Sequence, residues 1–264
     1  IVKVTSKGSI FFLQERVGLN QKPFMIWKFR SMNVTAEEKG PQLSSDEDAR
    51  ITSWGKIMRR WRIDELPQLC NVLIGDMSIV GPRAERKHYI EQIIKTHPEY
   101  LQLLTVTPGL TSLGMVKFGY AENVEEMIHR MKYDLAYQLI IDILSQKDIL
   151  LSVNSGSGIC EAKVEEGLSF RIKEKWATIG DEDRPWHIHL NMDEVIEAKF
   201  VKEPRSDGKQ SYSIRFFNSK GNLAMRANFT KMYDSSGNPV KEKVAKFDEI
   251  ASKYGSKESI SLNG

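Results

Sequence analysis

Two adjacent carboxylates, Asp64 and Glu65, stand directly behind a basic run in this chain. Neighbouring residues on a regular helix point about 100° apart, so the two side chains could take different roles at one site. Nearby positive charge favours the ionised form of a carboxyl group, and the run supplies it at Arg59, Arg60 and Arg62. An ionised carboxylate in such a place is a candidate nucleophile or magnesium ligand.

Two helices would position this pair. Residues 51–61 carry apolar side chains at helical spacing, and an amphipathic stretch over 66–73 ends at Gly75, which is typical of a helix C-terminus. Asp, Glu and Pro are also common in the first turn of any helix. The pair on its own, followed by Pro67, therefore fits an ordinary helix start as well as a catalytic site. Its neighbouring motifs favour the catalytic interpretation.

Those motifs lie on both sides of the pair. They are Gln14-Glu15-Arg16-Val17-Gly18, Lys28-Phe29-Arg30-Ser31-Met32, the stretch from Gly75 to Arg83, and Thr107-Pro108-Gly109-Leu110-Thr111. In this order and spacing the set resembles the catalytic region of the bacterial sugar transferases, the monotopic phosphoglycosyl transferases that load a phosphosugar onto undecaprenyl phosphate. The resemblance covers the first half of the chain, as far as Tyr137.

The resemblance implies an enzyme and a role for each of several residues. Asp64 would attack the sugar-side phosphate of a UDP-sugar, form an aspartyl phosphosugar and release UMP. Glu65 would hold Mg²⁺, and undecaprenyl phosphate would then attack the intermediate, which initiates exopolysaccharide or glycoconjugate synthesis. Fixed cations suit a diphosphate, so the expected substrate-binding residues are Arg59, Arg83, Lys28 and Arg30.

Composition and hydropathy bear on the cellular setting. The chain has 264 residues and a formal net charge of +3, which gives no indication of nucleic acid as a partner. No apolar run approaches the length that spans a bilayer, and we expect this chain to lack the re-entrant membrane helix of the resembled family. The predicted location is the cytoplasmic face of the bacterial inner membrane, with weak binding through the basic and aromatic surface near Trp27, Lys28 and Trp61.

After Tyr137 the pattern changes from helical to strand-like. Residues 149–164 read as a hairpin, and strand signals recur at 168–177, 186–190, 198–201, 211–217 and 223–229. Turns separate these strands, one of them at 181–183, and a final helix over 240–254 closes the pattern. The predicted fold class is α+β: a helix-rich phosphoglycosyl transferase catalytic region over 1–138, then an antiparallel-sheet α+β domain over 139–264.

The strand-rich half resembles one repeat of the haem-utilisation proteins of the HemS and ChuX type. The likeness rests on the stretches 186–190, 195–208 and 213–221. It implies haem binding as an alternative function, and a homodimer through the sheet. His187 and His189 alternate onto one face of a strand and could ligate a metal. Two histidines alone are more often structural or solvent-facing, and this sequence has no counterpart of the family's axial histidine.

Two smaller features complete the predictions. Cys70 and Cys160 lie outside any metal-ligand spacing and read as reduced, small apolar residues, with a disulfide left open. Arg130 and Lys132, on a helix predicted over 123–137, are expected to form ordinary surface ion pairs.

Overall fold

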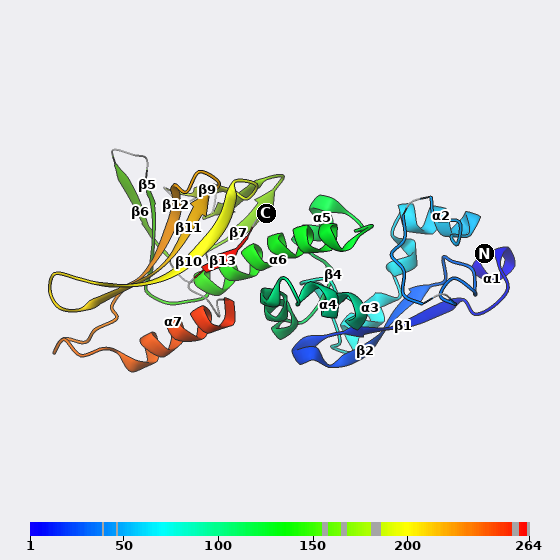
Figure 1. Cartoon of the computed structure of the whole chain (residues 1–264), viewed down its shortest axis with the longest axis horizontal. Helices are drawn as coiled ribbons and strands as arrows, with labels where there is room; N and C mark the ends of the chain where they lie inside the picture. The colour runs from blue at the N-terminus through cyan, green and yellow to red at the C-terminus, as the bar shows by residue number, and fades with distance from the viewer. Residues whose placement is uncertain are drawn as a thin grey trace. The chain divides into compact units, whose positions relative to one another are not determined.

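The structure is a computed structural model that describes residues 1–38, 40–45, 47–154, 158–164, 168–180, 186–254 and 259–262. The chain forms two compact units, Ile1–Asp134 and Leu135–Gly264 (Figure 1). The division falls within one long helix, α6 (Val124–Leu144). Helices and antiparallel sheets both occur, which confirms the α+β class. That the two parts fold independently, with a boundary at residue 138, stays a prediction.

The first unit alternates short strands with short helices and turns. Its elements before α6 are α1 (Val2–Thr5), β1 (Phe11–Val17), η1 (Leu19–Gln21), β2 (Pro23–Phe29), α2 (Ser53–Arg60), η2 (Ile63–Glu65), α3 (Gln68–Leu73), β3 (Ser78–Val80), α4 (Lys87–Ile93), η3 (Pro98–Thr105), β4 (Gly109–Thr111) and α5 (Leu113–Phe118). The β-branched side chains of residues 1–5 predict a strand, and this prediction is wrong. This stretch forms α1, because the N–H groups of Val4 and Thr5 bond the carbonyl of Ile1 within one helical turn.

The strands and α2 of this unit form the framework around the Asp64-Glu65 pair. β1 and β2 form an antiparallel hairpin, and β3 pairs with β4 in parallel. Thr52 caps α2 by accepting a hydrogen bond from the Gly55 N–H at 2.9 Å. A Cβ built on Gly55 would come within 1.9 Å of the Ser31 carbonyl oxygen. Only glycine therefore lets α2 lie this close to the segment that leaves β2.

Helix α6 differs from its prediction in both length and burial. It continues to Leu144, and two of its basic side chains, Arg130 and Lys132, are only 5% and 8% exposed. Arg130 Nη2 lies 2.5 Å from Glu85 Oε1, inside the first unit. The expectation of surface ion pairs is wrong at Arg130, because this side of the helix is packed.

The second unit is built on an antiparallel sheet. Its strands and helix are β5 (Ile149–Asn154), β6 (Ile159–Lys163), β7 (Phe170–Lys173), β8 (Trp176–Ile179), β9 (Ile188–Asn191), β10 (Val195–Pro204), β11 (Gln210–Asn218), β12 (Leu223–Phe229), α7 (Lys241–Tyr254) and β13 (Ser259–Ser261). Six strands form one sheet in the order β13-β10-β11-β12-β5-β6, and β7, β8 and β9 form another. The single strand predicted at 168–177 is two strands, because the backbone turns at Glu174, whose φ is 56°. The turn predicted at 181–183 lies outside the described residues.

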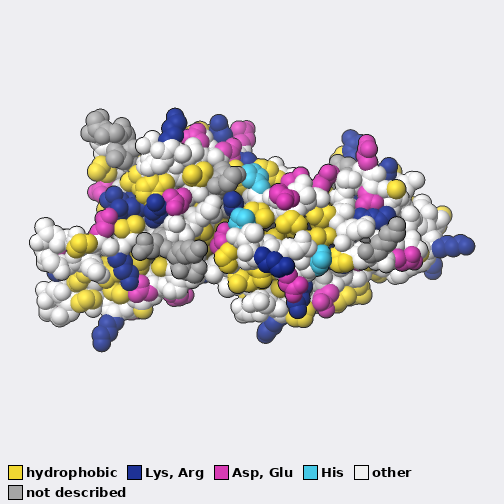
Figure 2. Space-filling model, viewed as in Figure 1, with side chains coloured by type: hydrophobic (Ala, Val, Ile, Leu, Met, Phe, Trp, Pro, Cys, Tyr) yellow, Lys and Arg dark blue, Asp and Glu magenta, His cyan; other side chains and the backbone are white. Residues whose placement is uncertain are grey.

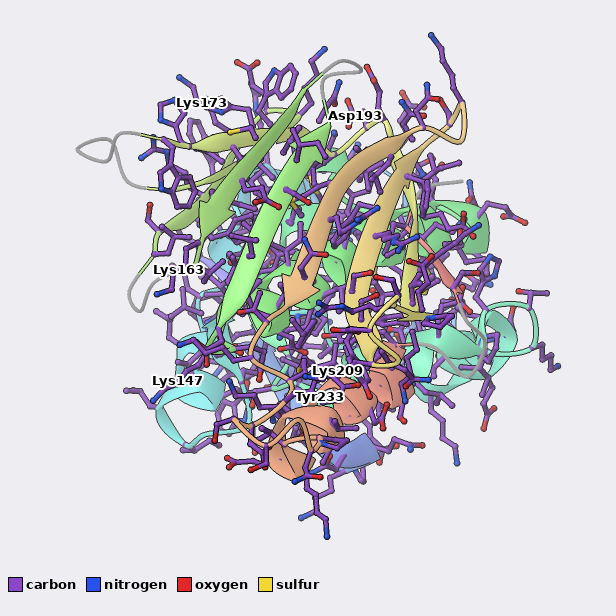
Figure 3. The ribbon with its side chains drawn as sticks, turned by 90° about the vertical axis from the view of Figure 1, so that its left-hand side faces the viewer. Lys147, Lys163, Lys173, Asp193, Lys209 and Tyr233 are labelled. Atoms are coloured by element: carbon purple, nitrogen blue, oxygen red, sulfur yellow. The ribbon has the colours of Figure 1, made fainter. Side chains whose placement is uncertain are left out.

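Helix α7 covers the larger sheet through aromatic contacts. The ring of Phe247 meets those of Tyr212 and Phe229 edge to face, at centroid distances of 5.3 and 5.0 Å. Figure 3 shows the strands of this sheet side by side, with Lys209 next to Tyr233 at one end of it. The Lys209 ammonium lies 5.1 Å from the Tyr233 ring centroid.

The surface mixes charged and hydrophobic side chains on the face drawn in Figure 2. Exposed large hydrophobic residues of the first unit include Trp61 at 70% and Leu73 at 85%. Both cysteines are exposed free thiols, so the disulfide left open by the sequence does not form. Within the described part of the chain, every helix is too short or too polar to cross a membrane.

Candidate active site

The Asp64-Glu65 pair lies on a tight turn between α2 and α3. After α2 ends, Arg62 adopts a left-handed backbone with φ 57° and ψ 20°, and the pair follows in the 3-10 turn η2. Left-handed backbone is uncommon for a residue with a side chain and recurs at functional sites. The turn leaves the Asp64 and Glu65 residues only 3% and 4% exposed. The predicted helix start is thus a separate turn that buries both carboxylates.

Asp64 borders a cavity of about 350 Å³ in the first unit. Its Oδ1 atom is buried and has no hydrogen-bond partner among the described residues. Burial raises the pKa of Asp64 above its ordinary value, against the opposing positive charges of Lys28 and Arg59. Burial therefore outweighs the flanking cations on which the sequence-based expectation rested. A buried carboxylate facing a cavity is a common feature of reactive sites.

Glu65 has the opposite environment. Its Oε1 lies 3.1 Å from Lys28 Nζ and 3.5 Å from Arg83 Nη2, and its Oε2 lies 3.7 Å from Arg62 Nη1. Burial on its own would raise the pKa of Glu65, but the positive charges of Lys28 and Arg83 together lower it well below its ordinary value. Glu65 is therefore ionised at neutral pH. The two neighbouring carboxylates face different surroundings, as their divergence predicts.

The two cations predicted at the end of β2, Lys28 and Arg30, already have partners within the protein. Lys28 pairs with Glu65, and the Arg30 guanidinium donates to three backbone carbonyls of residues 6–9 at 2.5 to 2.9 Å. Both side chains border the cavity. Arg30 thereby fastens the N-terminal segment to the end of β2. Substrate binding by Lys28 and Arg30 stays a prediction.

The other two predicted cations, Arg59 and Arg83, also border the cavity. Arg83 is aligned by carboxylates, with Nη2 3.5 Å from Glu65 and Nε 3.5 Å from Glu85. Arg59 Nη2 donates to Ser44 Oγ at 2.6 Å, while its buried Nη1 has no hydrogen-bond partner in the described part of the chain. Arg59 therefore keeps a charged donor that a phosphate oxygen could accept.

The sequence did not reveal two further residues, Glu85 and Tyr120. Glu85 is 6% exposed and pairs with Arg16 at 3.1 Å, Arg83 at 3.5 Å and Arg130 at 2.5 Å. It gathers cations from β1, from the turn after β3 and from α6. Arg16 and Arg83 both belong to the recognised motifs, but nothing in the sequence shows that one carboxylate joins them. Tyr120 follows α5 and borders the cavity.

Apolar side chains from β1, β2 and the segment that follows β2 also line the cavity. They are Phe11, Phe12, Phe29, Met32, Val34 and Leu43. The segment is tied down at Glu37, which accepts two hydrogen bonds from Arg86 at 2.9 and 3.1 Å. The cavity is thus lined by both cationic and apolar side chains.

A buried carboxylate beside fixed cations suits a phosphate-bearing substrate, and comparison with known proteins agrees. The family model described as bacterial sugar transferase matches residues 1–154, more than half of the chain. The chain belongs to the bacterial sugar transferase family. A second family model matches residues 137–254.

Curated relatives of this bacterial sugar transferase act on undecaprenyl phosphate by name. The UDP-N-acetylgalactosamine-undecaprenyl-phosphate N-acetylgalactosaminephosphotransferase of Aeromonas hydrophila is 38% identical over 162 residues, which cover 60% of this chain and 38% of that protein. UDP-glucose:undecaprenyl-phosphate glucose-1-phosphate transferases of Klebsiella pneumoniae and Caulobacter vibrioides are each 41% identical, over 52% of this chain and 30% and 52% of their own lengths. The chain therefore spans between 30% and 52% of these relatives.

Solved structures similar to the chain include ChuX, the type of protein that the second half resembles in sequence. The ChuX crystal structure is 16% identical, with a TM-score of 0.39 over 46% of this chain and 72% of that one. The rings of His187 and His189 lie 4.7 Å apart, and His189 Nδ1 is 3.0 Å from Thr178 Oγ1. The described residues contain no group of three or more metal-ligating side chains. Haem binding by the second unit stays a prediction.

Proposed function

We propose that this chain transfers a phosphosugar from a UDP-sugar to undecaprenyl phosphate, with Asp64 as the nucleophile. The observation that carries the proposal is the Asp64 carboxylate, buried at the edge of a cavity with one oxygen left without a hydrogen-bond partner among the described residues. An unpartnered buried oxygen is costly to keep, which is expected where a reacting group must stay accessible. The donors and acceptor named for the curated relatives supply the substrate class.

The reaction proceeds in two displacements. A carboxylate oxygen of Asp64 attacks the phosphorus next to the sugar, and the bond from that phosphorus to the bridging oxygen breaks, so that UMP leaves. A phosphate oxygen of undecaprenyl phosphate then attacks the phosphorus of the aspartyl phosphosugar, which frees Asp64 and gives an undecaprenyl diphosphosugar. Two positioned steps replace one crowded displacement between two anions.

The fixed cations stabilise the phosphoryl oxygens during both steps. Arg59 offers an unpaired guanidinium donor at the cavity, and Arg83 is held in place by Glu65 and Glu85. Donors that are already oriented stabilise developing charge more than mobile ones do, because they need no rearrangement during the reaction. Lys28 can also stabilise a phosphoryl oxygen, once the phosphate competes with Glu65 for the Lys28 ammonium group.

The donor set also fits a magnesium ion. Mg²⁺ is usually held by one or two carboxylates together with substrate phosphates, and Glu65 is an ionised carboxylate next to Asp64. Glu65 would be its ligand once substrate phosphate takes over the cations that now pair with it, Lys28, Arg83 and Arg62. When bound, the ion neutralises diphosphate charge and supports the departure of UMP.

The acceptor implies where the reaction takes place. Undecaprenyl phosphate is a lipid, so the chain must work at a membrane surface, and its UDP-sugar substrate favours the cytoplasmic face of the inner membrane. The exposed apolar residues of the first unit, Trp61 and Leu73 among them, are available for that contact. In such a setting the product would begin a surface polysaccharide or glycoconjugate.

The test is release of UMP from a panel of UDP-sugars, including UDP-glucose and UDP-N-acetylgalactosamine, with undecaprenyl phosphate and Mg²⁺ present. We expect turnover with at least one donor, loss of turnover in Asp64→Asn, and a loss of about 10- to 100-fold in Arg59→Met. Arg60→Met is the matched control, since Arg60 is exposed and carries the same charge. Equal activity of Asp64→Asn and the wild-type protein would remove Asp64 as the nucleophile.

A further inference from the structure

Tyr120 lies next to arginines that border the cavity. It follows α5, is half-buried, and borders the cavity together with Arg59, Arg83 and Asp64. No motif that marks the catalytic region includes it. Burial raises the pKa of Tyr120 to about 12, so the phenol stays neutral at physiological pH.

Three guanidinium groups surround the ring of Tyr120. The central carbon of Arg62 lies 3.9 Å from the ring centroid, that of Arg83 5.4 Å and that of Arg59 5.5 Å. All three distances fall within the range of a cation–π interaction, in which the negative face of the ring attracts the cation. These arginines come from the end of α2, the turn before η2 and the turn after β3.

Three neighbouring guanidinium groups require a stabilising contact. Three like charges near one point repel one another, and the nearby carboxylates do not neutralise all of them. Glu65 and Glu85 lie within ion-pair distance of Arg83, and Glu65 is 3.7 Å from Arg62, whereas Arg59 has no carboxylate within that distance among the described residues. The Tyr120 ring is the neutral group that all three share.

The cluster also has guanidinium donors that make no hydrogen bond to a described residue, although Arg62 Nη1 lies 3.7 Å from Glu65 Oε2. Nη1 of Arg59 and Nη1 of Arg62 are buried and have no hydrogen-bond partner among the described residues. Buried guanidinium donors are normally satisfied, because leaving them unpaired is costly. An anion that enters the cavity beside Asp64 would find Arg59 and Arg83 at its wall, both oriented by the same ring.

We propose that Tyr120 is a positioning residue, whose ring holds the guanidinium groups of Arg59, Arg62 and Arg83 so that the cavity binds a diphosphate. The ring acts through the arginines and needs no direct contact with the reacting atoms. The diphosphate is assigned to a UDP-sugar on the strength of the proposed function, but anion binding itself can be measured without it.

The experiment measures binding of inorganic pyrophosphate to the full chain by calorimetry, without metal. We expect Tyr120→Leu to weaken binding about tenfold, because it removes the cation–π contacts that hold the three guanidinium groups. Tyr120→Phe keeps the ring and should restore binding to within about threefold of the wild-type value. Tyr120→Met is a second ring-free variant with a longer, unbranched side chain, used if Tyr120→Leu does not fold.

Two controls separate positioning from a general loss of structure. Phe118→Leu removes another aromatic ring close by in the sequence and outside the cavity lining, and Arg60→Met removes an exposed charge from the same basic run. Both should bind pyrophosphate as the wild-type chain does. In a double-mutant cycle the losses in Tyr120→Leu and Arg62→Met should be strongly non-additive, since each disrupts the same stack.

The outcomes divide clearly. Wild-type affinity in the folded ring-free variants overturns the proposal, as does a Tyr120→Phe protein that binds as weakly as Tyr120→Leu, or a wild-type chain that binds no pyrophosphate. If pyrophosphate binding depends on the ring but no UDP-sugar releases UMP, the anion site stands and the proposed function fails. If UMP is released equally fast by wild-type and Tyr120→Leu proteins at low donor concentration, the function stands and Tyr120 has no positioning role.

Discussion

The neighbouring carboxylates should respond to neutralisation with opposite changes in stability. Glu65→Gln and Asp64→Asn each remove one negative charge and leave side-chain volume nearly unchanged. At neutral pH we expect Glu65→Gln to lower the free energy of unfolding of the first unit, and Asp64→Asn to raise it. The reason is that Glu65 is paired with cations, whereas burial disfavours the ionised form of Asp64.

The size of the Glu65 effect follows from its ion pairs. At the 3.1 Å between Glu65 Oε1 and Lys28 Nζ, the Coulomb attraction is roughly 5 kcal/mol for an effective dielectric constant near 20. Desolvation of the buried ions offsets part of this, but removing one partner of a buried pair leaves the other charge uncompensated, at a cost of about 3–5 kcal/mol. For Asp64→Asn we expect a gain of about 1 kcal/mol, because the unpaired oxygen remains and only its charge is removed.

The two effects should also depend on pH in opposite ways. The pKa of Glu65 in the folded chain lies below its ordinary value of 4.5, so its contribution is fully present above that pH and is lost as the pH falls toward the folded value. The pKa of Asp64 lies above its ordinary value of 3.8. The advantage of Asp64→Asn should therefore be absent below pH 3.8, grow as the pH rises through the folded pKa, and then level off.

Native-state hydrogen exchange in dilute urea is a suitable assay. Peptides from residues 1–134 report on the unit that holds the site, and peptides from residues 135–264 provide an internal reference. Glu15→Gln is the matched control, since Glu15 is exposed on β1 and its loss should change little. A fall in stability of equal size for Asp64→Asn and Glu65→Gln would refute the two different environments on which this reasoning depends.

Three further predictions concern the rest of the chain. Arg30→Met should release the segment 6–9 and cost about 2–4 kcal/mol, because three backbone carbonyls lose their charged donor; unchanged exchange of the N-terminal peptides would contradict this. The chain should bind anionic liposomes weakly and in a salt-dependent way, with Trp61→Ser weaker still, and complete flotation in high salt would be inconsistent with that surface. A fragment of residues 135–264 should unfold cooperatively on its own, whereas a gradual melt would show that it depends on the first unit.

The structure removes Lys28 from the surface that was predicted to bind the membrane. Lys28 was expected on the binding surface, but its ammonium group is paired with Glu65 and its side chain is only 15% exposed. The salt dependence must therefore come from exposed cations such as Arg60. Trp27 and Trp61, at 36% and 70% exposure, keep their place at the surface.

Much of the fold was predictable because it follows from local patterns. The helices α2 and α3, the strands β10 to β12 and the last helix α7 all reflect periodicity of 2 or 3.6 residues along the sequence. Short elements were harder. Residues 1–5 are rich in β-branched side chains, yet hydrogen bonds within one turn make them helical.

The site was predictable where its residues belong to recognisable motifs, which include Lys28, Arg30 and Arg83 as well as the Asp64-Glu65 pair. Asp64, Glu65 and Arg59 stand within seven residues of each other. Arg59 and Asp64 border the cavity, and Asp64 and Glu65 share the turn η2. The link between Glu85 and three distant arginines, and the ring of Tyr120 among three others, depend on tertiary packing that no spacing reveals. The burial of Asp64 also depends on tertiary packing. The flanking charges alone therefore predicted the wrong direction for the shift in its pKa.

The most direct test of Asp64 as the nucleophile is intact-mass spectrometry of the chain after incubation with its UDP-sugar and Mg²⁺, without undecaprenyl phosphate. We predict a mass increase of one phosphosugar, located on Asp64 by peptide mapping, absent from Asp64→Asn and discharged when undecaprenyl phosphate is added. Rapid UMP release with no adduct under acid quench, or an adduct that persists in Asp64→Asn, would contradict the account.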